Sequence, residues 1–430
     1  MKRIAFTVTL LSFLFTSVFF FGTPQQAQRK PTPRTTSKSN RDQALWQRAL
    51  AIHRRAIVID THNDVTTPMT NDDYDLSGTP PAPYRTSIER MKKGGLTAEF
   101  FSLYIRPWYV THGGAARRTL DMIDSVYRAV ERHPKDLMFA TSAADIRRAK
   151  AQNKIACLMG IEGGHAIENS LATLREFYRL GVRYMTLTHN NSNDWADSSR
   201  DVAKHNGLTD FGREVVREMN RIGMLVDVSH VSDKTMSDVL DVSTAPIIAS
   251  HSSARALANR PRNIPDDLLR RIAKNGGVVM VNFYPAFLSD AYNDAENARD
   301  ARIKPQRDAL EAQFKDDPKR LEEELKKLTD ANPIPKVPMS AIIDHIDHVV
   351  KVAGIDHVGI GSDFDGVPCL PQGIDSVADL PKITQALLDR GYTREQIHKV
   401  LGGNLLRVFR QVEAVSRRLQ SKTSAAPAAK

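Results

Sequence analysis

Residues 56–64, "AIVIDTHND", join a run of apolar and β-branched residues to a polar tip. The apolar part is typical of a strand buried on both faces, as in a parallel sheet. His62 and Asp64 are two residues apart, so on an extended segment both side chains project to the same side. Imidazole and carboxylate groups are common ligands of zinc and related ions. Taken alone, the segment fits either a metal site or a hydrogen-bonded structural pair.

Seven further segments have the same strand character, and amphipathic stretches such as residues 166–181 and 207–223 separate most of them. These segments are residues 96–105, 155–164, 182–190, 224–230, 246–253, 277–284 and 357–366. Gly223 follows the second amphipathic stretch as a C-cap would. Eight buried strands alternating with helices predict an α/β fold, a (β/α)8 TIM barrel. A doubly wound sheet is the alternative, but no GxGxxG motif follows any of the strands.

Polar residues stand at the carboxyl ends of these strands, the end at which TIM barrels build their active sites. They are His62, Asp64, Glu162, His189, His230, His251 and Asp363. Singly, a glutamate here fits an ion pair and a histidine fits a core residue. Together, one HxD pair, one glutamate and two histidines exceed the ligands of one tetrahedral zinc. They predict a binuclear centre in which Glu162 bridges two divalent metal ions.

Two adjacent metal ions point to hydrolysis, because they hold a hydroxide between them and polarise a carbonyl group. Nucleophilic catalysis by a side chain is disfavoured, since there is no GxSxG motif and Cys157 lies inside an apolar strand. The absence of a P-loop disfavours phosphoryl transfer. Only two cysteines occur, Cys157 and Cys369, so the fold depends on its hydrophobic core and not on a disulfide framework.

A series of motifs resembles the membrane (renal) dipeptidase family of zinc hydrolases, in a bacterial-type version. The motifs are "DTHND", "GIEGGHAIEN", "LTHNNSNDWADSS", "DVSHVSD", "ASHSSARAL", "RNIPDD", "GIGSDFDG" and "GGNLLRVF". Their order and spacing match from about residue 50 to 415, with Thr61 at a position where relatives usually carry glycine. The resemblance implies a TIM barrel with two zinc ions, one on His62 and Asp64, the other on His230 and His251, with Glu162 as the bridge.

The resemblance also implies roles that the residues alone do not assign. His189 would stabilise the oxyanion of the tetrahedral intermediate, and Arg262 would bind the carboxylate of the substrate. Tyr284 could assist Arg262, although a core aromatic residue fits equally well. Asp363 would accept a proton from the bridging water, pass it to the leaving amine, and help to hold the substrate's amino group.

These inferences predict a zinc-dependent dipeptidase that hydrolyses free dipeptides by attack of a metal-bridging hydroxide. One alternative is a barrel metallohydrolase that acts on another amide or a lactam. The other is a non-catalytic surface binding protein on the same scaffold. Nucleic-acid binding is not expected despite a net charge of +10, because the basic residues are scattered and not clustered with aromatic ones. The sequence leaves open whether the chain forms a homodimer.

The ends of the chain have compositions of their own. Lys2 and Arg3 precede an uncharged run to residue 22, which predicts a signal sequence or an uncleaved N-terminal membrane anchor. The protein is therefore expected to be exported, to the periplasm or cell surface. Residues 23–42 and 419–430 are expected to be a disordered linker and tail around a single catalytic domain, 43–418. A charged helical insertion at about 288–336 fits a solvated surface hairpin or an active-site lid.

Overall fold

The computed structural model describes residues 37–80, 83–315 and 317–425 of the chain. The predicted leader and the residues up to 36 lie outside this range. The chain divides into two compact units, Met1–Asp42 and Gln43–Lys430. Helix α1 (Ser37–Arg55) starts within the first unit, and every strand belongs to the second. Among the described residues, no helix is long and apolar enough to span a bilayer.

Eight parallel strands form the nearly closed barrel that the sequence predicts, in the order β1-β2-β4-β5-β6-β7-β8-β9. Their bounds are β1 (Ile59–Asn63), β2 (Ala98–Tyr104), β4 (Ile155–Glu162), β5 (Val182–Thr186), β6 (Leu225–Asp227), β7 (Ile248–Ala249), β8 (Val278–Val281) and β9 (Val358–Ile360). A ninth strand, β3 (Leu137–Phe139), pairs only with β4 and lies off this path. The sequence did not predict β3, because three residues are too few to show a strand pattern.

Adjacent residues of the strands belong to two different cores. Phe100 and Phe101 of β2 are both fully buried, yet they fall in separate hydrophobic clusters. Side chains alternate between the two faces of a strand, so one cluster fills the barrel and the other lies under the outer helices. The inner cluster contains Tyr184 and residues of the C-terminal helix, including Phe409. This double burial explains the nearly continuous apolar runs of the strands.

The first and last strands of the barrel meet at their carboxyl ends. Asn63 and Phe364 form a parallel bridge, and the Asp64 amide donates to the Phe364 carbonyl at 2.9 Å. The Asp363 amide donates in turn to the His62 carbonyl at 3.0 Å. The barrel is therefore joined at the rim by segments that also carry the polar residues predicted for the site.

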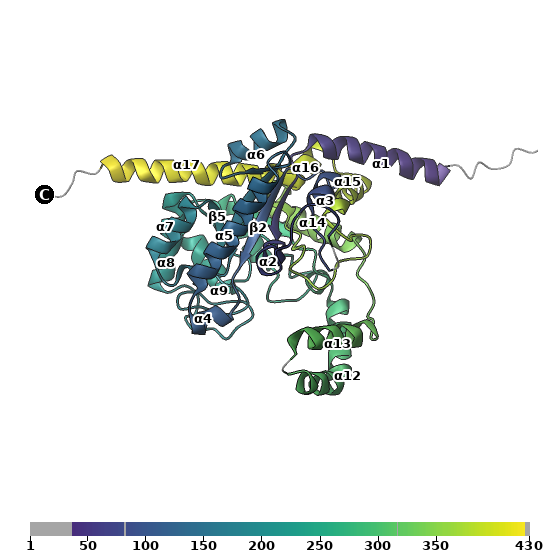
Figure 1. Cartoon of the computed structure of the whole chain (residues 1–430). Helices are drawn as coiled ribbons and strands as arrows, with labels where there is room; N and C mark the ends of the chain where they lie inside the picture. Colours follow the sequence, from purple (N-terminus) through teal and green to yellow (C-terminus); the bar gives the residue numbers. More distant parts are fainter. Residues whose placement is uncertain (1–36, 81–82, 316, 426–430) are drawn as a thin grey trace, which may run out of the picture. The chain divides into compact units, whose positions relative to one another are not determined.

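Helices cover the outer face of the barrel; for example, α5 packs on β2 (Figure 1). Helix α14 packs on β9. The longer ones are α5 (Ala115–Arg132), α6 (Ala143–Ala151), α7 (Leu171–Arg179), α8 (Asp210–Ile222), α9 (Asp233–Val242), α10 (Asp266–Asn275), α14 (Ser340–Ala353), α15 (Leu380–Asp389) and α17 (Asn404–Ala425). Short helices are α2 (Thr66–Asn71), α3 (Ile88–Lys93), α4 (Trp108–His112), α11 (Pro285–Leu288) and α16 (Arg394–His398). Gly223 ends α8 in the left-handed conformation, with a φ of 92°, as its C-cap position predicts.

The charged segment after β8 contains two helices, α12 (Asp290–Gln313) and α13 (Pro318–Asp330), which pack on each other (green in Figure 1). At the C-terminus, α17 continues to Ala425, past the residue at which a disordered tail was expected to begin. The Ser416 hydroxyl and the Gln420 amide both donate to the Arg221 carbonyl, at 2.7 and 3.0 Å. These bonds hold the last part of α17 on α8.

Candidate metal centre

The predicted site residues converge at the carboxyl ends of the barrel strands. His62 is the penultimate residue of β1, Asp64 follows that strand, and Glu162 is the final residue of β4. The other four follow β5, β6, β7 and β9 within a few residues: His189, His230, His251 and Asp363. All seven are buried, with at most 9% of each residue exposed. Because parallel strands end at one rim, residues more than 300 positions apart meet there.

Glu162 lies at the centre of this group. Its Oε1 is 2.9 Å from His230 Nε2, 3.3 Å from His251 Nε2, 3.6 Å from His62 Nε2 and 3.8 Å from His189 Nε2. Possible ligand atoms form three overlapping groups, each within 4.8 Å. The groups are His62–Glu162–His251, Glu162–His189–His230 and His62–Asp64–Asp363. Glu162 is thus placed to share a metal ion with neighbouring histidines, because carboxylate oxygens and imidazole nitrogens are common ligands of such ions.

Hydrogen bonds at Nδ1 orient two of the histidine rings, those of His62 and His251, whereas Nδ1 of His189 and of His230 has no hydrogen-bond partner among the described residues. His62 Nδ1 lies 2.8 Å from the Tyr184 hydroxyl, and His251 Nδ1 lies 2.8 Å from Ser250 Oγ. Ser250 Oγ donates to Asp227 Oδ2 at 2.6 Å, so a chain of hydrogen bonds supports His251. Both histidines thus turn Nε2 towards Glu162. Such partners typically fix the tautomer of a metal-binding histidine.

Buried polar atoms in this cluster favour a bound cation. His62 Nε2 and Asp64 Oδ1 are buried and have no hydrogen-bond partner among the described residues. Burial lowers the pKa of His230 and His251 well below its ordinary value, which leaves both rings neutral, as metal ligands must be. Burial alone would also lower the pKa of His62, but Tyr184 and the carboxylates of Glu162 and Asp64 raise it well above its usual value. The surroundings of His62 therefore stabilise positive charge.

Asp363 occupies a strained position at the edge of the cluster. Its backbone φ is +66°, and that of His230 is +67°, values that residues other than glycine rarely adopt. The Asn282 amide donates to Asp363 Oδ2 at 2.8 Å. A Cβ on Gly366 would lie 2.1 Å from Asp64 Oδ2 and 2.5 Å from Asp363 Oδ1, so the loop needs glycine there. Burial raises the pKa of Asp363 to about 6.

A cavity of about 350 Å³ opens beside the cluster, a size suited to a small ligand. Arg262 and Tyr284 line it together with Asp64, Glu162, His189, His230 and Asp363. Arg262 donates to Ser252 Oγ at 3.2 Å and to the His251 carbonyl at 3.1 Å, and it stacks over Phe287 at 5.2 Å. Burial lowers its pKa to about 10, so it remains positively charged at neutral pH. Its Nε is buried and has no partner among the described residues.

Several residues around the site were not assigned a function from the sequence. Tyr104 lines the cavity and its ring lies 4.7 Å from that of His189, and the exposed Arg200 lines it as well. Hydrogen bonds from outside the cluster reach three of the candidates: Tyr184 contacts His62, Ser250 contacts His251, and Asn282 contacts Asp363. Ser250 lies inside the motif "ASHSSARAL", but its contact with Asp227 depends on the pairing of β6 and β7. That pairing is not visible in the spacing of either strand.

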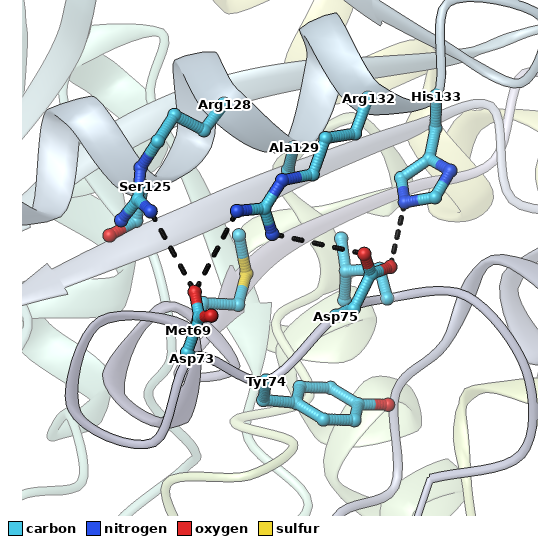
Figure 2. A pocket seen from close by; sticks show the side chains of 10 residues that line it. Met69, Asp73, Tyr74, Asp75, Ser125, Arg128, Ala129, Arg132 and His133 are labelled. Carbon is cyan, nitrogen blue, oxygen red and sulfur yellow. Dashed lines mark hydrogen bonds and ion pairs between the residues drawn. The ribbon is translucent and has the colours of Figure 1, made fainter.

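A second hollow, at the outer face of α5, has a different character. Figure 2 shows Arg128, Arg132 and His133 directed towards Asp73 and Asp75 of the loop after α2. His133 Nε2 is 2.7 Å from Asp75 Oδ1, and the arginine nitrogens lie 3.7–3.8 Å from the two aspartates. Its volume is only about 10 Å³. The charges of this hollow neutralise one another, so it is a surface ion-pair network.

The chain resembles known proteins over most of its length. Residues 46–423 match the model of the membrane dipeptidase family, peptidase family M19. The chain is 37% identical to mouse Dipeptidase 3 over 383 residues, which cover 87% of this chain and 68% of the mouse protein. The structure of the probable dipeptidase PvdM from Pseudomonas aeruginosa superposes with a TM-score of 0.75 at 27% identity, over 87% of this chain and 99% of that one.

A third relative carries a ligand. It is a metallo peptidase from Rhodobacter sphaeroides, liganded with a phosphinate mimic of the dipeptide L-Ala-D-Ala. Its TM-score is 0.67 at 25% identity, over 83% of this chain and 99% of that one. The family match spans the whole barrel, including every residue of the rim described above. The chain therefore belongs to the membrane dipeptidase family, peptidase family M19, and is a metallo-dipeptidase.

Proposed function

We propose that this protein is an exported, zinc-dependent dipeptidase that cleaves free dipeptides into two amino acids. The observation that carries the proposal is the position of the Glu162 carboxylate, within 4 Å of four imidazole nitrogens and beside a cavity that holds Arg262 and Asp363. His62 and Asp64 would hold one ion, His230 and His251 the other, and Glu162 would bridge them. When bound, the two ions would supply hydroxide at neutral pH and polarise the peptide carbonyl.

The remaining residues would position the substrate and move its protons. The buried Arg262 guanidinium suits a carboxylate, because a planar fork makes paired, charge-assisted hydrogen bonds. Asp363 would take a proton on a carboxylate oxygen and deliver it to the leaving amine. A pKa of about 6 suits both steps, since neither form is strongly disfavoured near neutrality. Asn282 would hold this carboxylate in place.

His189 would donate a hydrogen bond to the developing oxyanion. Burial lowers its pKa to about 3, so the ring is neutral and carries a single N–H. A neutral donor in a buried site stabilises negative charge that develops during the reaction without attracting a free anion as strongly as a cation would. Tyr284 lines the same cavity near Arg262 and would help to confine the carboxylate end of the substrate.

A panel of substrates tests the proposal. With zinc bound, we expect hydrolysis of free dipeptides and much slower hydrolysis of tripeptides and N-acetylated dipeptides, because both charged ends are recognised. Arg262→Gln should lower kcat/KM about a hundredfold, the size of loss expected when a buried charge loses its partner. Arg217→Gln, an exposed position on α8, is the matched control. Equal rates on blocked and free dipeptides would contradict the two-ended model. Export is tested separately, by cell fractionation of the full chain.

A further inference from the structure

Another cavity adjoins the cavity at the metal centre on the side of Arg262. Its volume is about 540 Å³, and it shares four lining residues with the cavity at the metal centre: Arg200, Arg262, Tyr284 and Phe287. The far wall comes from the first half of α12, through Glu296, Asn297 and Asp300. The charged insertion therefore contributes to a chamber next to the active-site cavity.

The charges that line this chamber are unequally compensated. Glu296 lies 3.6 Å from Arg299, and Asp300 lies 2.9 Å from Arg299 and 3.3 Å from Arg307. Both carboxylates of the chamber are thus already paired with arginines of their own helix. The lining arginines have no such acidic partners within the described part of the chain: Arg260 donates to the neutral amide oxygen of Asn293.

Arg200 is the least constrained of these arginines. Its backbone amide donates to Ser198 Oγ at 3.3 Å, whereas its guanidinium has no ion pair or hydrogen bond to any residue that the structure describes. An exposed arginine is usually only a solvated surface charge. Arg200 differs because it lines both cavities. Its charge is also near enough to Arg262 to contribute to lowering the pKa of that guanidinium, after the larger effect of burial.

We propose that Arg200 is a specificity-determining residue that binds a carboxylate on the side chain of the substrate's C-terminal residue. This inference rests on the proposed dipeptidase function. When the substrate's C-terminal carboxylate binds Arg262, the side chain of the same residue branches from the Cα atom next to that carboxylate. This side chain therefore starts beside Arg262, where the two cavities share their lining. An aspartate or glutamate side chain then reaches the free guanidinium of Arg200. The protein therefore prefers dipeptides that end in an acidic residue.

The test compares acidic substrates with neutral ones of the same shape. The substrates are Ala-Asp with Ala-Asn and Ala-Glu with Ala-Gln, each in both configurations at the C-terminal residue. We expect kcat/KM to be roughly tenfold higher for the acidic member of a pair, the effect of one partly exposed charge-assisted hydrogen bond. In Arg200→Gln this ratio should fall to about one, and in Arg200→Glu it should drop below one. The ratio within one variant cancels any loss of folded or metal-loaded protein.

Two controls make the outcome specific. Arg217→Gln removes an exposed arginine that lines neither cavity and should keep the wild-type ratio. Ala-Ala separates the two levels of the proposal: if no dipeptide is hydrolysed, the dipeptidase function itself fails. If Ala-Ala and Ala-Asn are cleaved as well as Ala-Asp, or if Arg200→Gln keeps the acidic preference, only the role of Arg200 is overturned.

Discussion

At the scale of single residues, the ligand candidates depend on side chains that do not reach the centre themselves. Asp227 accepts hydrogen bonds from Ser250 Oγ at 2.6 Å, from the Ser250 amide at 2.8 Å and from Thr186 Oγ1 at 2.5 Å. Ser250 in turn contacts His251 Nδ1. Because its hydroxyl donates to Asp227, it must accept from His251. This direction places the proton on Nδ1 and leaves Nε2 as the lone-pair donor.

Removing the Ser250 hydroxyl should therefore weaken metal binding without deleting a ligand. We expect Ser250→Ala to lower zinc affinity about 10- to 100-fold, the usual cost of losing an outer hydrogen bond to a metal-binding histidine. Competition with a chromophoric chelator measures this directly. Ser253→Ala deletes the same atom on the same loop, where the hydroxyl makes only a 3.5 Å contact with the Asn282 carbonyl, and should bind zinc normally. Equal affinities in Ser250→Ala and the wild type would contradict the assignment.

A histidine far from the rim links stability to pH. His345 on α14 is fully buried, accepts from the Ala254 amide at 3.0 Å and lies 3.3 Å from the Leu288 carbonyl. Burial lowers its pKa from 6.5 to about 4. Between these values the unfolded chain binds a proton that the folded chain does not. The stabilising contribution is therefore complete above pH 6.5 and is lost as the pH falls towards 4.

His345→Gln keeps a donor and an acceptor but cannot titrate. We expect the free energy of unfolding of the metal-free protein to fall by about 2 kcal/mol less in this variant than in the wild type between pH 6.5 and 4.5. Urea unfolding at the two pH values gives the difference. His112→Gln, on the exposed α4, controls for replacing a histidine elsewhere. The same pH-dependent loss in His345→Gln and the wild type would show that His345 is not the group responsible.

At the scale of elements, much of the architecture could be predicted because parallel strands leave a simple pattern of apolar runs and polar ends. Contacts between strands could not be predicted in the same way. The pair Gly160 on β4 and Tyr184 on β5 is an example. A Cβ on Gly160 would lie 2.0 Å from a Tyr184 ring carbon. Only the register of β4 against β5 brings them together, and that register contains an irregularity at Met159.

This pair predicts a coupled effect on stability. Gly160→Ala should lower the free energy of unfolding by roughly 2–3 kcal/mol, because the methyl group forces the buried Tyr184 ring to move. The same substitution should cost less than about 1 kcal/mol in a Tyr184→Leu background, where the ring is absent. Denaturant titrations of the four proteins of this cycle measure both costs. Equal costs in the two backgrounds would mean that Tyr184 is not the obstacle.

At the scale of the whole molecule, the metal centre joins parts of the barrel that are distant in sequence. Its candidate ligands come from the ends of β1, β4, β6 and β7, and β1 also pairs with the segment after β9 through Asn63 and Phe364. The resemblance to a known family could name candidate ligands, since their motifs are local. The chamber lined by α12 could not be predicted, because it depends on where a charged insertion folds back on the barrel.

A centre that ties several strands together should stabilise the fold when it is loaded. A ligand present at a thousand times its dissociation constant stabilises the native state by about 4 kcal/mol. We therefore expect a chelator to lower the Tm of the full chain by several degrees, and added zinc to restore it. Glu162→Gln should lose most of this zinc-dependent shift, because the bridging carboxylate is gone. Glu296→Gln, the same change in the neighbouring chamber, should keep it. A full shift in Glu162→Gln would show that the stabilising metal does not need the Glu162 carboxylate, the one carboxylate among the described residues within 4 Å of four imidazole nitrogens.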